Sequence, residues 1–361
     1  METKFKKILS KDFFLRVSID EQVLFAKELF IMVHAGLPLL HALETISSQM
    51  KPSSFKKILS SVKADVANGT FLWVSFNKFN NVFGSLFVNI IRVGEESGTL
   101  DGSLKYLAEE LRKRSEIKRK VVGALVYPSV IISLTVLISG SMVFFIIPKI
   151  IPVFQSLNVK LPFTTRVLIS TSDFLVHKGH YLLIGLVLTF IVGHFALRNK
   201  KIRYVSDYFL TFTPILGEIV RGINVMNICR TFSLLLQSNI KIVETAEITT
   251  DTIDNLVYKA KLENIIESLK KGTSISKELK LDKKLFPDIM ANLVEVGEQT
   301  GDLTGNLKYL SEYYENEVDN QIKNITVIIE PLLLVSVGLA VGFIAISIIA
   351  PIYSLSQTLT M

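Results

Sequence analysis

The sequence has little of what catalysis and metal binding require. It contains one cysteine, which excludes an internal disulfide, a cysteine-rich metal site and a disulfide-stapled secreted scaffold. No Walker phosphate loop is present, because Gly69 and Gly272 are each followed by threonine and not by a Gly-Lys-Ser/Thr ending. HExxH and GxSxG motifs are also missing, and we interpret His177 and His180 as a solvated pair rather than metal ligands. We therefore expect no enzyme, no cofactor and no metal.

Charge is missing from three long stretches. Hydrophobic residues make up 49% of the 361-residue chain and charged residues 20%, a mixture that predicts both soluble and membrane-embedded parts. No charged side chain lies between Lys120 and Lys149, and a helix rising about 1.5 Å per residue crosses the roughly 30 Å hydrocarbon core within that length. Residues 181–197 form a shorter apolar stretch, and Glu330 is the only charge after Lys323. The sequence predicts three membrane spans.

Basic residues flank these stretches unevenly. They concentrate at 112–120, before the first stretch, and at 198–203, after the second, whereas the end of the chain carries none. Because Lys and Arg are retained on the cytoplasmic side, we expect a cytoplasmic N-terminus and an extracytoplasmic C-terminus. We interpret the run at 112–120 as a flank that contacts anionic lipid, with partner docking as the alternative. No stacking aromatics or reader motif accompany it, so nucleic acid is not an expected partner. The first residues lack a sustained apolar core, so we expect no signal peptide.

One unit of the chain is duplicated. The segment VGEESGTLDGSLKYLAEE from Val93 recurs as VGEQTGDLTGNLKYLSEY from Val296, an offset of 296 − 93 = 203. The same offset, without a gap, pairs Pro128 in the first apolar stretch with Pro331 in the third. Agreement at one spacing in soluble and apolar segments indicates that the whole unit, span included, was duplicated. The second span then returns the chain so that the copies are parallel repeats.

Helical spacing dominates each copy, and no segment shows the alternation of a strand. We expect Asp20 to cap the first helix, Gly36 to end it, a fifth helix to begin near Ser85 and a sixth near Ser103. The fold class expected is an all-α integral membrane protein with two tandem repeated cytoplasmic six-helix bundles and three transmembrane helices. An aromatic-rich stretch is expected to be core rather than a partner groove: Phe71, Trp73, Phe76, Phe79, Phe83 and Phe87.

These patterns divide the chain into eight parts. They are a flexible N-terminus at 1–18, the first cytoplasmic domain at 19–120, transmembrane helix 1 at 121–148, an extracytoplasmic connection at 149–180, transmembrane helix 2 at 181–197, the second cytoplasmic domain at 198–323, transmembrane helix 3 at 324–353 and an extracytoplasmic tail at 354–361.

A glutamate follows a glycine at the same place in both copies. Glu95 and Glu298 fall on the last turn of a helix, where the helix dipole disfavours a negative charge, so a local compensating contact is expected. One interpretation is a carboxylate that accepts backbone or Arg/Lys hydrogen bonds and fixes the turn; the other is a partner-docking contact or a cation site. The candidate partner or turn-fixing residues are Gly94, Glu95, Gly98, Leu100, Gly297, Glu298, Gly301 and Leu303.

Four residues of the apolar stretches are candidate intramembrane contacts: Tyr127, Pro128, Glu330 and Pro331. Glu330 holds the place that Tyr127 has in the first copy. Glu330 either reaches the interface and pairs with Lys323 or a lipid amine, or faces a groove where it meets a subunit helix or another protomer. Pro331 favours the second alternative, because proline removes a backbone hydrogen bond and kinks a helix.

These features resemble a known family. The motif GE-x-[ST]-G-x-L at 94–100 and 297–303, the paired membrane prolines and the three predicted spans are similar to the inner-membrane platform proteins of type IV pilus and type II secretion machines, the type II secretion F-domain family. The most specific stretch surrounds the first span: Lys120-Val121, Ala124-Leu125, Tyr127-Pro128, Ile131, Thr135, Met142 and Ile146-Ile147-Pro148.

The resemblance implies a non-catalytic platform in a bacterial or archaeal-type cytoplasmic membrane. Its implied partners are a cytoplasmic hexameric assembly ATPase, pilin or pseudopilin subunits, other inner-membrane assembly proteins, the lipid bilayer and further copies in a homo-oligomer. The rival hypothesis is a small-solute transporter or an intramembrane enzyme, which requires several polar or broken spans that converge at mid-membrane. Three spans with one glutamate do not make such a path within one chain.

Overall fold

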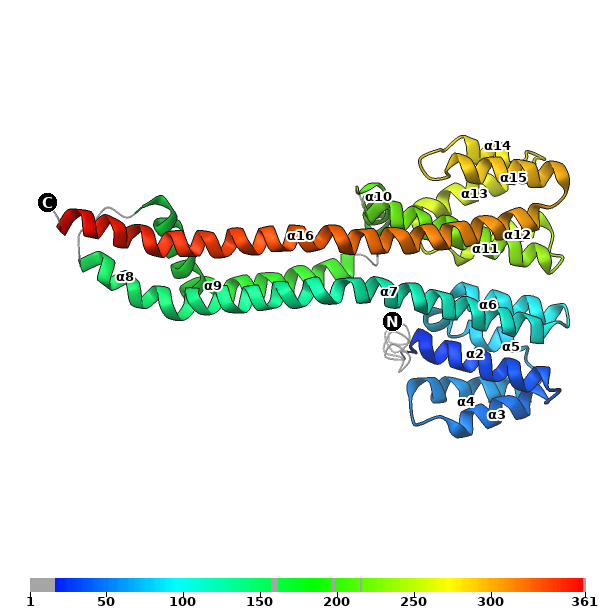
Figure 1. Ribbon diagram of the computed structural model, residues 1–361. Coiled ribbons are helices and arrows are strands. Elements are labelled where there is room, and N and C mark those ends of the chain that lie inside the picture. Colours follow the sequence, from blue (N-terminus) through cyan, green and yellow to red (C-terminus); the bar gives the residue numbers. More distant parts are fainter. Residues whose placement is uncertain (1–16, 157–161, 197–198, 215, 360–361) are drawn as a thin grey trace, which may run out of the picture. The chain divides into compact units, whose positions relative to one another are not determined.

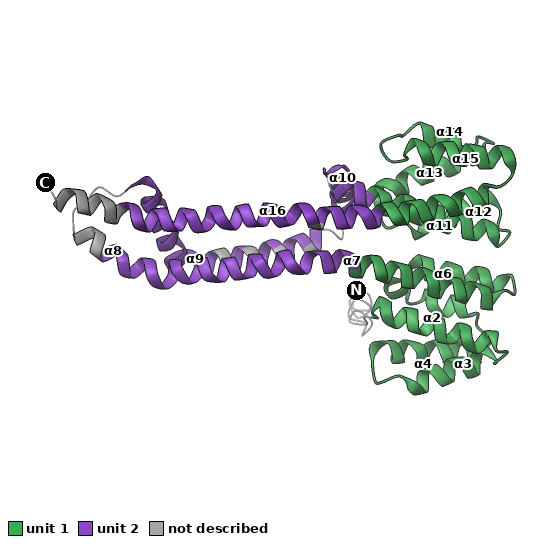
Figure 2. Cartoon of the chain, in the orientation of Figure 1, with its two compact units in different colours: residues 1–119, 221–317 green, residues 120–220, 318–361 purple. Residues whose placement is uncertain are grey.

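The structure is a computed structural model that describes residues 17–156, 162–196, 199–214 and 216–359. All regular elements in those ranges are helices. The chain divides into two compact units, one of residues 1–119 with 221–317 and one of residues 120–220 with 318–361 (Figure 2). Almost all of the N-terminus predicted at 1–18 lies outside the described residues.

The first repeat contains six helices within the described residues, as the sequence predicts (Figure 1). Figure 1 labels them along the chain. Their bounds are α2 (Ile19–His34), α3 (Leu39–Gln49), α4 (Ser54–Ala67), α5 (Leu72–Asn77), α6 (Asn80–Glu96) and α7 (Leu100–Ser141), the last of which continues into the second unit.

The start of α2 differs from the prediction. Ser18, not Asp20, is the N-cap: its hydroxyl accepts the Glu21 N–H, and the Glu21 carboxylate accepts the Ser18 N–H at 2.7 Å. This reciprocal pair satisfies two backbone donors that a cap at Asp20 would leave open. Asp20 lies in the first turn and accepts hydrogen bonds from Ser115 and Arg119, in that order the main reasons that its pKa lies below the ordinary value.

The fifth and sixth helices also begin earlier than predicted. Helical geometry in α6 starts at Asn80 but is interrupted at Gly84, whose φ of 79° and ψ of 162° are not helical, so the prediction near Ser85 matches the part after the break. Helix α7 begins at Leu100 rather than Ser103. The start predicted near Ser85 therefore falls at a break inside a helical segment and not at its beginning.

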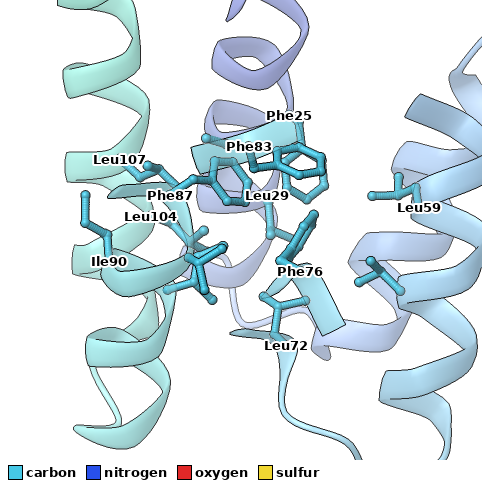
Figure 3. Close-up of a cluster of buried hydrophobic side chains, with 14 of the residues drawn as sticks. Phe25, Leu29, Leu59, Leu72, Phe76, Phe83, Phe87, Ile90, Leu104 and Leu107 are labelled. Atoms are coloured by element: carbon cyan, nitrogen blue, oxygen red, sulfur yellow. The ribbon is translucent and has the colours of Figure 1, made fainter. Parts of the chain in front are cut away.

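Phenylalanines fill the core of the first bundle. Figure 3 shows Phe25, Phe76, Phe83 and Phe87 gathered between the helices, and all four are buried. The rings of Phe83 and Phe87 are 4.7 Å apart between centroids, and those of Phe76 and Phe87 are 5.0 Å apart and edge to face. The predicted core role is confirmed for Phe76, Phe83 and Phe87, and Trp73 and Phe79 are partly buried against the same core. Phe71 is 55% exposed, so the prediction is wrong for that residue.

The second repeat follows the first in register. Three of its helices begin 203 residues after their counterparts: 39 + 203 = 242, 72 + 203 = 275 and 100 + 203 = 303. Its helices are α11 (Leu216–Gln237), α12 (Ile242–Thr252), α13 (Leu256–Lys270), α14 (Ile275–Lys280), α15 (Asp288–Thr300) and α16 (Leu303–Leu359).

The core of the second bundle has smaller side chains at two matching positions. Phe76 and Phe87 of the first bundle correspond, at the offset of 203, to Leu279 and Met290. An apolar pocket in the second core is lined by side chains that include Ile228, Leu279 and Met290. The second core therefore has a pocket beside the two positions where the first core holds phenylalanine rings.

The second unit holds the segment that joins the two repeats. Besides parts of α7 and α16 it contains a π-helical turn η2 (Met142–Ile146), α8 (Ile147–Ser156), α9 (Phe163–Ala196) and α10 (Lys200–Phe212). Two buried hydroxyls connect these elements: Ser172 donates to the Val143 carbonyl of η2 at 2.8 Å, and Thr165 donates to the Ser347 carbonyl of α16 at 2.7 Å. A π-helical turn disturbs the regular backbone bonding, and Ser172 supplies a donor there.

Three described helical stretches are long and apolar enough to cross a membrane: Leu100–Ile150, Leu303–Ala350 and Leu216–Gln237. The first contains the predicted first span, and the second contains residues 324–350 of the third span predicted at 324–353. In each, 11% of the apolar window is buried. The third is α11, 61% of whose window is buried, and we assign it to the second bundle, where it is the counterpart of α2. The span predicted at 181–197 falls on α9 and on residue 197, which lies outside the described residues, and it stays a prediction.

Candidate functional site

The carboxylate of Glu95 contacts the start of another helix of its own bundle. Its two oxygens accept hydrogen bonds from the backbone N–H groups of Leu72 at 2.8 Å and Trp73 at 3.0 Å. These are the first donors of α5, whose N-cap residue Phe71 provides no side-chain hydrogen bond. Glu95, 23 residues along the chain, therefore supplies the cap that α5 lacks locally.

Glu298 makes the matching contacts in the second bundle. It accepts from the N–H groups of Ile275 at 2.6 Å and Ser276 at 3.3 Å, and also from the Ser276 hydroxyl. Ser274, the N-cap of α14, makes no capping bond of its own. The charge that the dipole of its own helix disfavours is thus placed at the N-terminus of a neighbour, where a negative charge is stabilised.

Steric constraints explain why glycine is needed at each glycine position of the motif. Gly98 and Gly301 have φ values of 72° and 80°, a left-handed conformation that ends α6 and α15 at low cost only with glycine. A Cβ on Gly94 would lie 2.5 Å from the Ser103 Cβ, and a Cβ on Gly297 would lie 2.8 Å from a backbone atom of the next helix. Gly94 and Gly297 therefore allow α6 and α15 to approach the helix that follows.

The leucines of the motif face the two cores. Leu303 is buried, and Leu100 is half-buried against the first core. The capping bonds of the glutamates, the turns and close approaches of the glycines and the burial of the leucines all stabilise the fold of each bundle. A further role in partner docking stays a prediction.

A buried ion cluster joins the two bundles inside the first unit, and sequence reasoning missed it. Arg230 of α11 is 7% exposed in its side chain, and it contacts Glu110 of α7 at 3.2 Å and Glu315 of α16 at 2.9 Å. Glu110, 1% exposed, also accepts from Arg114 at 2.9 Å, and Lys113 reaches Glu315 at 2.8 Å. Three helices from both repeats therefore meet at these side chains, which we call the inter-repeat cluster.

The pKa of Glu110 lies below its ordinary value. Burial acts against this and raises the pKa, but the guanidinium groups of Arg114 and Arg230 stabilise the carboxylate more strongly. The sequence held one signal of this site: Glu110 lies between the core residues Leu107 and Leu111, and a charge on an apolar helix face needs a partner.

The basic run at 112–120 has more protein partners than the sequence suggested. Arg119 pairs with Asp20 at 2.9 Å, Lys120 pairs with Asp319, and Lys113 belongs to the inter-repeat cluster. The lipid-facing interpretation did not foresee these acidic partners, because they come from segments about 100 to 200 residues distant along the chain.

The four candidate intramembrane residues are not brought into one site by any described hydrogen bond or ion pair. Helical structure continues through Pro128 and Pro331. Pro128 is buried, whereas Tyr127, Glu330 and Pro331 are exposed. Within the described part of the chain Glu330 makes no ion pair with Lys323, so the predicted pairing on the same helix is not formed here.

Together these observations define a class of protein: a membrane protein whose helical bundle, with the glutamate-capped turn, is duplicated together with the apolar helix that follows. The family model described as type II secretion system, protein F, matches twice, at residues 25–148 and 228–351. Both bounds shift by 203, the offset of the repeat. The chain belongs to the type II secretion system protein F family, which confirms the resemblance found in the sequence.

Individual relatives come from two kinds of machine. The type II secretion system protein F of Aeromonas hydrophila is 29% identical over 344 residues, which cover 95% of this chain and 88% of the relative. The type IV pilus assembly protein PilC of Thermus thermophilus is 31% identical over 343 residues, or 95% and 84% of the two chains. The type II secretion system protein F of Vibrio cholerae is 31% identical over 284 residues, or 79% and 70%.

Proposed function

We propose that the protein is a non-catalytic platform for assembly of a type IV pilus or of a type II secretion pseudopilus. The observation that carries the proposal is the continuity of α7 and α16. Each begins in a bundle, at Leu100 or Leu303, and runs without a break into an apolar stretch. A continuous helix that contributes to a bundle core and to an apolar segment is suited to couple events in water to events in a membrane.

The proposed mechanism needs an energy source outside this chain. The sequence has no phosphate loop, so a cytoplasmic hexameric ATPase would dock on the bundles and hydrolyse ATP. The inter-repeat cluster would make the two bundles respond together, because separating them leaves buried charges without partners. Displacement of α7 and α16 would then help pilin or pseudopilin subunits leave the bilayer and join the fibre.

We further propose that the two bundles serve different partners. Their helices share one register, but matching surface positions differ in chemistry: His34 and His41 of the first bundle correspond to Gln237 and Glu244 of the second. His34 is exposed and pairs with Asp101 at 3.2 Å. Docking surfaces that have diverged in this way would bind the ATPase with unequal affinity.

Copurification tests the platform proposal. The full chain, tagged and extracted in mild detergent, is expected to retain the assembly ATPase of the same machine. Deletion of the gene for this chain is expected to abolish fibre formation or secretion. The matched control is an unrelated three-span protein with the same tag. Solute uptake by proteoliposomes of the purified chain, with no ATPase retained, would instead support a transporter.

The bundle proposal is tested by changing the charge at two equivalent surface positions. His41→Glu in the first bundle and Glu244→His in the second exchange the matched residues. Unequal losses of ATPase binding would support divergent surfaces. Equal losses, or none, would contradict them.

Glu330 is proposed to meet a subunit helix or another protomer within the membrane. A carboxylate costs about 2.5–3.5 kcal/mol at the bilayer centre on insertion scales, and such residues usually face a protein partner. We expect Glu330→Gln to leave insertion and abundance intact but to reduce fibre assembly. Ser336→Ala, farther along α16, is the control. Normal assembly by both Glu330→Gln and Glu330→Leu, at normal abundance, would eliminate this role.

A further inference from the structure

Helix α10 (Lys200–Phe212) exposes an apolar face. Ile202, Val205 and Phe209 recur at helical spacing and therefore share one side of the helix. Their exposed fractions are 45%, 52% and 69%.

The opposite face of α10 is polar and turned toward the protein. Thr211 is fully buried, and its hydroxyl donates to the Asp207 carbonyl at 2.7 Å. Asp207 is half-buried on the same side. A helix on the surface of a soluble bundle buries its apolar face and exposes its polar one, and α10 does the reverse. A surface of this kind is expected to face something other than water.

The charged and aromatic residues of α10 indicate which environment its apolar face contacts. Lys200 and Lys201 are exposed at the start of α10 and form no ion pair within the described residues. Tyr204 and Tyr208 are also exposed, and tyrosines of this kind are enriched where a bilayer meets water. Basic residues on the polar side of a helix with an exposed apolar face are typical of helices that lie in the plane of an anionic membrane surface.

We propose that α10 is an interfacial helix that inserts Ile202, Val205 and Phe209 into the surface of a bilayer and places Lys200 and Lys201 among anionic phospholipid headgroups. The apolar helix α9 ends at Ala196, a few residues before α10 begins, so a membrane lies within reach if α9 spans it. The helix would hold the start of the second repeat at the membrane surface.

Spin labelling of the full chain in proteoliposomes tests the apolar face. In a Cys229→Ala background, labels at Ile202, Val205 and Phe209 are expected to collide several-fold more often with oxygen than with a water-soluble nickel chelate. A label at Leu281, 77% exposed on the second bundle, is the matched control and should show the reverse. If Cys229→Ala fails to fold, the native Cys229, which is fully buried, is kept.

Two outcomes would overturn the proposal. Preferential access of the nickel chelate to Phe209 would place the face in water. Exclusion of both reagents with dipolar broadening between labels would place it against a second copy of the chain.

The headgroup contact is tested by lipid composition. The Phe209 label should lie deeper in vesicles of equal parts phosphatidylcholine and phosphatidylglycerol than in phosphatidylcholine alone. Lys200→Glu with Lys201→Glu should remove at least half of that difference, whereas Lys284→Glu, an exposed lysine of the second bundle, should not. Equal depth in both vesicle types would overturn the role of the anionic headgroups.

Discussion

At the scale of single residues, the two motif glutamates resolve an apparent conflict. Each carries a charge at the unfavourable end of its own helix, and each is stabilised at the favourable end of another. The helices that they cap, α5 and α14, contain 6 residues each. Helices this short gain little from internal bonding, so a cap from outside contributes a large share of their stability.

We expect Glu95→Ala to lower the free energy of unfolding by about 0.5–2 kcal/mol, the usual cost of losing a cap. Glu95→Gln should lose less, because its amide oxygen still accepts one hydrogen bond. The measurement is thermal unfolding of the purified chain in detergent. Glu96→Ala is the control, since that neighbouring side chain is exposed. ATPase binding that fell without any loss of stability would indicate docking instead of capping.

Gly94→Ala is expected to destabilise the protein by roughly 1–3 kcal/mol, because the new methyl group overlaps Ser103. Gly102→Ala is the matched variant: it lies in the next helix with no heavy atom within 4 Å of the added Cβ. Alanine there should stabilise the helix by up to about 1 kcal/mol. Chemical denaturation of both variants distinguishes close packing from helix propensity, and equal effects would refute the packing argument.

At the scale of elements, the inter-repeat cluster determines how α7, α11 and α16 meet. Its members come from both copies but do not repeat: Arg230 corresponds to Lys27, and Glu110 corresponds to Tyr313. The contact can be asymmetric because the two bundles meet through different surfaces, so residues at matching positions need not have matching partners.

Glu110 should make stability depend on pH. Its pKa in the folded protein lies below the ordinary value of 4.5, so its contribution is complete above that value and is lost as the pH falls through the folded-state pKa. Glu110→Gln is expected to cost about 1.5–3 kcal/mol at pH 7, the range for hydrogen bonds to charged groups. The difference in the free energy of unfolding between Glu110→Gln and the native chain should become smaller below pH 4.5. Glu109→Gln, at an exposed position, should unfold with the same free energy as the native chain.

The two cores allow an exchange of matched residues. Met290→Phe fills the apolar pocket of the second bundle as Phe87 does in the first, and we expect a gain of about 0.5–2 kcal/mol. Phe87→Met is expected to lower stability, because it removes ring contacts with Phe76 and Phe83. Both variants are compared by thermal unfolding. Loss of stability in Met290→Phe would show that the second core cannot accept an aromatic ring.

At the scale of the whole molecule, the membrane topology can be measured directly. In a Cys229→Ala background, cysteines at Ser156 and Ser356 should react with an impermeant reagent from outside the cell, and cysteines at Ser61 and Ser268 should not. The reason is the retention of basic flanks on the cytoplasmic side. Permeabilised cells provide the control for reactivity. The reverse labelling pattern would refute the predicted orientation.

Much of the fold could be predicted from local patterns. Helix starts at 39, 72 and 100 recur 203 residues later because sequence periodicity and turn residues act over a few neighbours and were duplicated with the chain. The sequence prediction places the cap of α2 at Asp20, although Ser18 and Glu21 match the S-x-x-E pattern of the capping box that the structure forms.

The sequence by itself determined the helical class, the duplication and the apolar stretches, because each depends on spacing or composition along the chain. Only the tertiary structure decided which donors Glu95 and Glu298 bind, which acids neutralise Arg230 and which face of α10 is exposed. Those contacts join residues about 20 to 120 positions apart, or depend on which side of a helix its neighbours cover. No local pattern encodes that pairing, since it arises from the packing of whole helices.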